Sequence, residues 1–166
     1  AHQEVHQAGA SGAGQNRLWF TVDRPGRYPG QCAELCGTQH AGMRFTVIAV
    51  SQEEYETWLE EQAAPAAQPV PGSLEARGKE IVSGGSLCHT CHVIRGVEAM
   101  VGRTGPDLTH VASRDKLAGE VFSSSKEDLA RWIADPDSMK PGSKMPDTDL
   151  TDEEVEAVVA YLLSLK

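Results

Sequence analysis

The sequence predicts two small domains, a β-rich one followed by an all-α one. Two strand-like stretches, residues 17–23 and 44–50, alternate or are rich in β-branched side chains. After residue 74, apolar residues recur at helical spacing. Between these parts lies AAPAAQPVPG, which is typical of an extended Pro/Ala-rich linker. The predicted boundaries are residues 1–62, 63–73 and 74–166.

The first domain is expected to run strand, long loop, strand and helix. The Pro- and Gly-punctuated residues 25–43 predict the loop. Ser51, followed three residues later by Glu54, predicts the capped start of the helix. Helices are predicted in the second domain at residues 74–82, at residues 126–134, and in an apolar C-terminal stretch capped by Thr151 and Glu154.

Charge and size exclude several functions. The chain has 166 residues, only 5% of them aromatic, and a net charge of −9. Small domains with thin cores often need a metal or a covalent cofactor for stability. An acidic excess in both domains argues against binding to nucleic acid or to a membrane surface through a basic patch. No apolar run approaches the roughly 20 residues that span a bilayer, and AHQEVHQ at the start has no signal-peptide pattern.

The four cysteines form two close pairs, Cys32 with Cys36 and Cys88 with Cys91. Each pair has histidine nearby in the sequence. Close pairs beside histidine indicate metal or cofactor sites rather than a disulfide framework. Two disulfides remain the alternative interpretation.

Residues 88–92 read C-H-T-C-H, which is the attachment pattern of a c-type haem. Two thiols at this spacing can add to the two vinyl groups on one porphyrin edge, and His92 then reaches the iron as the proximal ligand. A zinc site is the alternative, but it needs further ligands, and this domain offers only His89 and His110. We expect His89 to be exposed to solvent.

A haem that only transfers electrons usually has a sixth ligand, and a Met thioether raises its reduction potential. Three methionines follow the haem motif: Met100, Met139 and Met145. Met145 lies in K-P-G-S-K-M-P, where Pro and Gly hold the backbone extended so that a side chain can turn inward. We therefore predict Met145 as the axial ligand, and Met100 and Met139 as packing residues.

Residues 74–166 resemble a small bacterial class I cytochrome c. The shared order is an N-terminal helix, C-x-x-C-H, G-P-D-L, a Trp-bearing helix, K-P-G-x-x-M-P and a C-terminal helix. The resemblance implies that the Pro106 carbonyl accepts a hydrogen bond from the axial imidazole, which fixes its tautomer. It also implies that Gly78 packs near Tyr161, where the first and last helices meet. Trp132 matches an aromatic residue near the haem, with plain helix packing as the alternative.

A second group of ligands lies between the two predicted strands, in the stretch CAELCGTQHAGM. Thiolate and thioether select soft ions such as Cu(I), and imidazole suits copper as well. The stretch closely resembles the dinuclear CuA loop of cytochrome c oxidase subunit II, which joins strands of a cupredoxin-like β-sandwich. The resemblance implies that Cys32 and Cys36 bridge two coppers. His40 and Met43 would then be terminal ligands, and Glu34 would supply its backbone carbonyl.

The chain departs from that family in its N-terminal part. The family has one further His ligand, which precedes the first Cys by more residues than lie before Cys32 here. Its transmembrane hairpin and early strands have no counterpart either. His2 and His6 are the candidates for that ligand, and mobile terminal residues are the simpler interpretation of both. We therefore expect a partial sandwich whose copper site is empty, partly filled or completed by another segment.

Together the resemblances imply electron transfer in a respiratory chain. Electrons would pass from an external donor to the haem, to the copper pair and then to subunit I, so this chain would not itself reduce oxygen. Covalent haem attachment implies assembly outside the cytoplasm, at the periplasmic or outer face of the membrane. Two alternatives remain open. One is a docking cytochrome c module that has lost its copper, and the other is a peroxidase-like enzyme with an open sixth haem position, against which Met145 argues.

Overall fold

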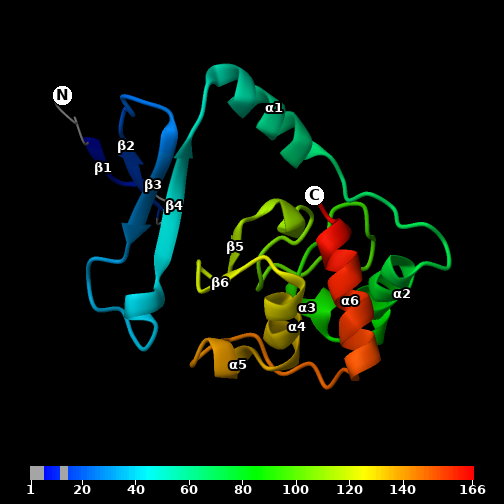
Figure 1. Cartoon of the computed structure of the whole chain (residues 1–166). Coiled ribbons are helices and arrows are strands. Elements are labelled where there is room, and N and C mark those ends of the chain that lie inside the picture. Colours follow the sequence, from blue (N-terminus) through cyan, green and yellow to red (C-terminus); the bar gives the residue numbers. More distant parts are fainter. Residues whose placement is uncertain (1–5, 12–14) are drawn as a thin grey trace.

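The computed structural model describes residues 6–11 and 15–166, and up to residue 18 it describes the backbone alone. Strands and one long helix make up the N-terminal part, and a compact group of helices makes up the C-terminal part (Figure 1). Among the described residues, no helix is long and apolar enough to cross a membrane.

The N-terminal part contains two antiparallel strand pairs. Strand β1 (His6–Ser11) pairs with β2 (Gln15–Trp19), and β3 (Gly26–Gln31) pairs with β4 (Arg44–Ala49). The two pairs are separate two-stranded sheets. The chain therefore has a small sheet region ahead of its helices, and the cupredoxin-like sandwich remains a prediction.

Strand β3 corrects the expectation that residues 25–43 form one continuous loop. The whole of β3 pairs with β4, and Pro29 lies opposite Thr46 within the ladder. Pro is tolerated there because a strand of a two-stranded sheet has one side without a partner strand. The Pro and Gly residues that predicted a loop therefore lie partly within an edge strand.

Helix α1 (Gln52–Ala63) begins where the sequence predicts. The Ser51 hydroxyl accepts a hydrogen bond from the Glu54 N–H at 3.2 Å, and the Ser51 N–H donates to the Glu54 carboxylate at 2.8 Å. No residue of α1 is buried, and Trp58 remains 50% exposed. Figure 1 shows α1 standing above the gap between the strands and the C-terminal helices. Contacts at its ends must therefore set its orientation.

The C-terminal part is helical, as predicted. Its three longer helices are α2 (Leu74–Glu80), α4 (Lys126–Ala134) and α6 (Asp152–Ser164), and Thr151 with Glu154 caps α6. Short elements fill the connections: a π-helical turn Ile81–Gly85, α3 (Cys88–Cys91), a 3₁₀ turn Val111–Ser113, β5 (Lys116–Leu117), β6 (Phe122–Ser123) and α5 (Pro136–Met139).

Helices α2 and α6 meet at Gly78, as the resemblance implied. A Cβ on Gly78 would lie 2.6 Å from the carbonyl carbon of Ala157 and 2.8 Å from the Cβ of Tyr161. A side chain at this position would therefore push the two helices apart. Among the described residues, the buried apolar side chains all lie at Ala66 or beyond. The hydrophobic core thus belongs to the C-terminal part.

The burial of Tyr161 predicts a loss of stability at alkaline pH. Its side chain is 0% exposed, and burial raises the pKa of its hydroxyl from 10.0 to about 12. Its contribution to stability is complete below pH 10 and is lost as the pH rises through the folded-state pKa. The full loss corresponds to about 2–3 kcal/mol. Denaturant titrations across this range should show the loss in the wild type but not in Tyr161→Phe. An equal loss of stability in both proteins would contradict the assignment of this loss to Tyr161.

Candidate metal centres

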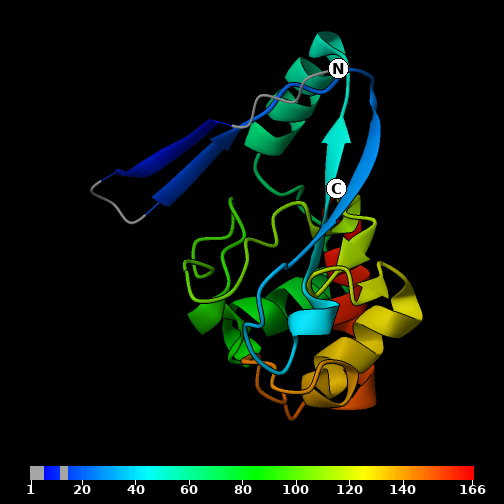
Figure 2. The same ribbon diagram turned by 90° about the vertical axis from the view of Figure 1, so that its left-hand side faces the viewer.

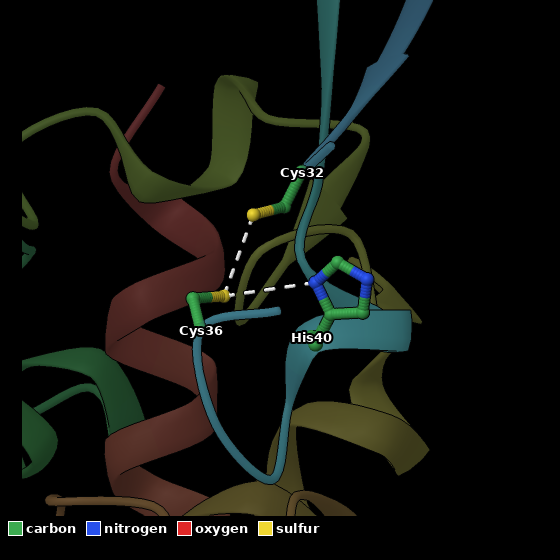
Figure 3. Close-up of side chains that lie close together, drawn as sticks. All are labelled: Cys32, Cys36 and His40. Atoms are coloured by element: carbon green, nitrogen blue, oxygen red, sulfur yellow. Dashed lines mark hydrogen bonds between the residues drawn. The ribbon is translucent and has the colours of Figure 1, made fainter. Parts of the chain in front are cut away.

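The loop between β3 and β4 carries the predicted copper ligands. The Cys32 N–H donates to the Met43 carbonyl at 3.0 Å and closes the base of the loop next to the last residue pair of the sheet. A 3₁₀ turn, His40–Gly42, leads into β4. The side chains of Cys32, Cys36 and His40 point toward one another (Figure 3). The paired strands thus hold both ends of a loop whose ligands converge.

The ligand atoms of this loop lie close together. The sulfur atoms of Cys32 and Cys36 are 3.4 Å apart, and the Cys36 sulfur is 3.8 Å from Nδ1 of His40 (Figure 3). The Cys36 sulfur is also 3.8 Å from Sδ of Met43. The Glu34 carbonyl oxygen lies 3.1 Å from the Cys32 sulfur. The structure therefore brings together all the groups that the resemblance implied for this loop.

The thiols of both cysteine pairs are free, which differs from the disulfide alternative. The 3.4 Å between Cys32 and Cys36 far exceeds a disulfide bond of about 2.05 Å. The hydrogen bond to Cys32 raises the pKa of the Cys36 thiol above its ordinary value, and partial desolvation and the charge of Cys32 raise it further. Metal coordination acts in the opposite direction, because it deprotonates a thiol.

The donor set of this loop fits copper. Two thiols, a thioether and an imidazole are the ligands that copper prefers. Cys36 is exposed and Met43 is 48% exposed, so the group lies at the surface. His2 lies outside the described residues, and His6 is described only as the first residue of β1, opposite Trp19. The source of the further His ligand therefore remains a prediction.

The C-H-T-C-H segment forms a single helical turn. Helix α3 places Cys88 and Cys91 three residues apart, which puts their side chains on the same helix face. The His92 N–H closes the turn by donating to the Cys88 carbonyl at 2.9 Å, and His92 itself has an extended backbone. The two thiols can therefore reach one edge of a flat group while the imidazole approaches from the next position.

Pro106 orients the His92 imidazole. Nδ1 of His92 lies 2.8 Å from the Pro106 carbonyl oxygen, so that Nδ1–H donates and Nε2 is left for a metal. Gly105 makes room for the ring, because a Cβ there would lie 2.5 Å from Cε1 of His92. This cradle fits an axial imidazole. We did not predict Gly105 as a site residue, although its place directly before Pro106 was the available signal.

Met145 lies half-buried on the loop that follows α5. Its N–H donates to the Ser143 hydroxyl at 3.2 Å. Gly142 turns the loop with a φ of +82°, and its N–H donates to the Asp137 carboxylate at 2.8 Å. A positive φ at this point favours glycine. The Pro- and Gly-based frame on which the Met145 prediction rests is therefore present.

The other candidates for the haem side have partners of their own. Met100 is 1% exposed within the core and Met139 packs against that core, as expected of packing residues. Trp132 packs on Phe122, with ring centroids 5.4 Å apart. This contact agrees with the packing interpretation of Trp132.

A zinc site around the C-H-T-C-H turn finds no support. His89 is half-buried rather than exposed, and its Nδ1 lies 2.8 Å from the Ser86 carbonyl oxygen. Both ring nitrogens of His110 face backbone carbonyl oxygens. Among the side chains that the structure describes, the one group of three or more potential His, Cys, Asp or Glu ligands lies in the β3–β4 loop.

Two family models match this chain. The cytochrome c model matches residues 75–166, which are more than half of the chain. The model of the periplasmic domain of cytochrome c oxidase subunit II matches residues 5–50. The first match contains the haem motif, and the second contains the loop with the copper ligands.

Relatives named cytochrome c oxidase subunit 2 are matched across both parts. Cytochrome c oxidase subunit 2 of Alkalihalophilus pseudofirmus is 38% identical over 152 residues, 91% of this chain and 43% of that protein. Its namesake in Bacillus subtilis is 38% identical over 162 residues, 92% of this chain and 45% of that protein. The chain thus spans less than half the length of these relatives.

Among solved structures, the c-type cytochrome SorU from Sinorhizobium meliloti is 29% identical, with a TM-score of 0.40, over 55% of this chain and 90% of its own. The family assignment rests on the sequence matches of the two parts. The chain belongs to the cytochrome c family, and its cytochrome c domain follows a segment, residues 5–50, that matches the model of the cytochrome c oxidase subunit II periplasmic domain.

Proposed function

We propose that this chain carries electrons for a cytochrome c oxidase. It would take them from an external donor into its C-terminal part and pass them through the β3–β4 loop to subunit I. The observation that carries the proposal is the orientation of His92. Its Nδ1–H donates a hydrogen bond to the Pro106 carbonyl at 2.8 Å, so that Nε2 can bind a metal. The matches to both families support it.

The C-terminal part would hold haem c through four side chains. Cys88 and Cys91 would form its thioether bonds, and His92 and Met145 would be its axial ligands. Haem c bound there supplies one-electron Fe(II)/Fe(III) chemistry. Bound to the iron, the Met145 thioether would favour the reduced state and would fill the sixth position, which a peroxidase leaves open. These residues thus suit a carrier of electrons.

The β3–β4 loop would hold copper. Cys32 and Cys36 would bridge the metal pair, His40 and Met43 would be terminal ligands, and Glu34 would contribute its carbonyl. Copper bound there supplies a second one-electron centre. Because these ligands lie at the surface, a partner such as subunit I could approach them directly. Covalent haem assembly favours a location at the periplasmic or outer face of the membrane.

Copper binding to the haem-loaded chain tests the second half of this route. We expect added copper to produce intense thiolate-to-copper absorption bands that Cys36→Ser abolishes. Leu35→Ala is the matched control, because Leu35 lies in the same loop, is 84% exposed and has no ligand atom in its side chain. We also expect a chelator to remove the copper readily, because the side chains that the structure describes supply one His ligand to this loop and no second one.

Three outcomes separate the alternatives. Photoreduction of the haem, followed by its reoxidation in the copper-loaded wild type but not in Cys36→Ser, would support the route. A chain that binds no copper under any condition would favour the docking module. Retention of two coppers per chain through chelation would contradict the expected lability and make His6 the first candidate for the further ligand.

A further inference from the structure

The C-terminal end of α1 is bound to the cytochrome c part through its backbone carbonyls. The Arg95 guanidinium donates to the carbonyl of Ala63 at 3.1 Å and also to that of Gln62. Nε2 of His110 lies 3.0 Å from the carbonyl of Ala64. Three consecutive carbonyls therefore have partners on the C-terminal part, more than thirty residues further along the chain in each case.

Helix chemistry explains why Arg and His suit this position. The last carbonyls of a helix have no partner within it and carry partial negative charge. Donors and positive charge are therefore favourable there, and the forked guanidinium of Arg95 can reach two carbonyls at once. Since no residue of α1 is buried, these contacts are well placed to fix the direction of the helix.

The residues after α1 continue the contact. The Ala66 N–H donates to the Arg95 carbonyl at 2.8 Å, and Ala66 is only 5% exposed. The backbone turns at Gly96 with a φ of +89°, and a Cβ there would lie 3.1 Å from Pro65. Arg95, His110 and Gly96 thus form a seat for the end of α1. Nδ1 of His110 also lies 2.9 Å from the Lys166 carbonyl oxygen, so this seat contacts the last residue of the sequence. The Pro/Ala-rich stretch thus begins as a packed segment.

Asp107 connects this seat with the residue that orients His92. Its carboxylate lies 3.9 Å from Nε of Arg95, and it directly follows Pro106 in the sequence. Burial alone raises the pKa of Asp107. Hydrogen bonds from Thr109 and the charges of Arg95 and Arg114 outweigh burial, so the pKa lies below its ordinary value. Asp107 is therefore ionised at neutral pH and attracts Arg95.

A second contact joins the two parts at the other end of the β-hairpin. Gln39, in the loop with the copper ligands, donates from Nε2 to the Pro141 carbonyl at 2.8 Å. Pro141 lies four residues before Met145. Arg27 of β3 also pairs with Asp115 at 2.6 Å. Figure 2 shows the β3–β4 loop beside the segment that follows α5.

We infer that Arg95 and His110 are positioning residues, which hold α1 so that the β3–β4 loop docks on the Met145 loop at a fixed distance. This inference rests on the proposed function, because electron transfer between two centres slows steeply as their separation grows. A free Pro/Ala-rich tether would let the two parts move apart. With the β3–β4 loop and the C-terminal end of α1 both held, the distance between the two sets of ligands is set by the fold.

Energy transfer to the haem tests this positioning in the full, haem-loaded chain. Ile48 on β4 is 53% exposed, so Ile48→Cys can carry a fluorophore once Cys32→Ser and Cys36→Ser remove the other free thiols. We expect one short fluorescence lifetime for the parent. Arg95→Gln should lose that component and give a broad distribution of longer lifetimes. Arg77→Gln, an exposed arginine of α2, is the matched control and should resemble the parent.

Backbone amide exchange gives a second readout. We expect the Ala66 amide to exchange about tenfold faster in Arg95→Gln. This factor corresponds to the free energy of roughly one lost hydrogen bond to a charged group. His110→Gln is the second variant and should also lengthen the lifetime. Unchanged lifetimes in both variants would overturn the inference. Neither readout depends on electron flow, so a held distance without electron transfer would count against the proposed function alone.

Discussion

Gly78→Ala should destabilise the cytochrome c part by about 3 kcal/mol or more, because the added methyl group has no room. Its Cβ would lie 2.6 Å from the carbonyl carbon of Ala157 and 2.8 Å from the Cβ of Tyr161. Both neighbours belong to α6, and a backbone atom cannot move aside as a flexible side chain can. Guanidinium unfolding followed by far-ultraviolet circular dichroism measures the change.

Gly84→Ala is the matched control for this prediction. Gly84 lies in the π-helical turn that follows α2, and a Cβ there would meet no atom within 4 Å. Replacing a helical glycine with alanine in open space should raise stability by up to about 1 kcal/mol. Equal effects of the two substitutions would show that helix propensity, and not close approach of α2 and α6, decides the role of Gly78.

Met145→Ala should change the spin state and reduction potential of the bound haem. Loss of the thioether should leave ferric haem mainly high-spin and lower its potential, within the roughly 0.8 V that axial ligands control. Absorption spectra and a redox titration measure both properties. Met139→Ala is the control, because Met139 packs against the core and should leave the spectrum nearly unchanged. A larger effect at Met139 would show that the axial assignment is wrong.

Local sequence patterns predicted most of the helical structure. The capping residues Ser51 and Thr151 each began a helix as expected, because a cap and its partner lie within four residues of each other. Strand β3 was missed because its Pro and Gly residues favour a turn locally. It forms through pairing with β4, and such pairing across a loop has no local signal.

The candidate sites also combine features that local sequence predicts with features that it does not. The spacing within residues 32–43 and within residues 88–92 predicted that the candidate ligands of each site lie close together, and they do, because one loop and one helical turn carry them. The contacts of Arg95 and His110 could not be predicted, since their partners at the end of α1 lie 32 and 46 residues away. Long-range contacts to backbone carbonyls leave no recognisable pattern in a single sequence.

The contacts at the β3–β4 loop and at the C-terminal end of α1 have a consequence for the proposed route. The seat at Arg95 and the contact between Gln39 and Pro141 together leave the segment little freedom to swing. Copper binding in the β3–β4 loop should therefore change the haem site at the Met145 loop, and a change at the Met145 loop should alter copper binding, since coupling between two sites is reciprocal. The copper titration and the redox titration described above both measure this coupling.

The absorption spectrum of the whole chain through one cycle of reduction and reoxidation tests the central claim most directly. The chain would be produced with haem-attachment machinery and its spectrum recorded on the folded protein, and a separate portion would be extracted with acidified acetone to test whether the haem is covalently attached. We predict that haem stays attached through Cys88 and Cys91, is low-spin in both oxidation states, and returns unchanged on reoxidation. Extraction of the haem, or a high-spin ferric form, would contradict its role as a bound electron carrier with His92 and Met145 as axial ligands.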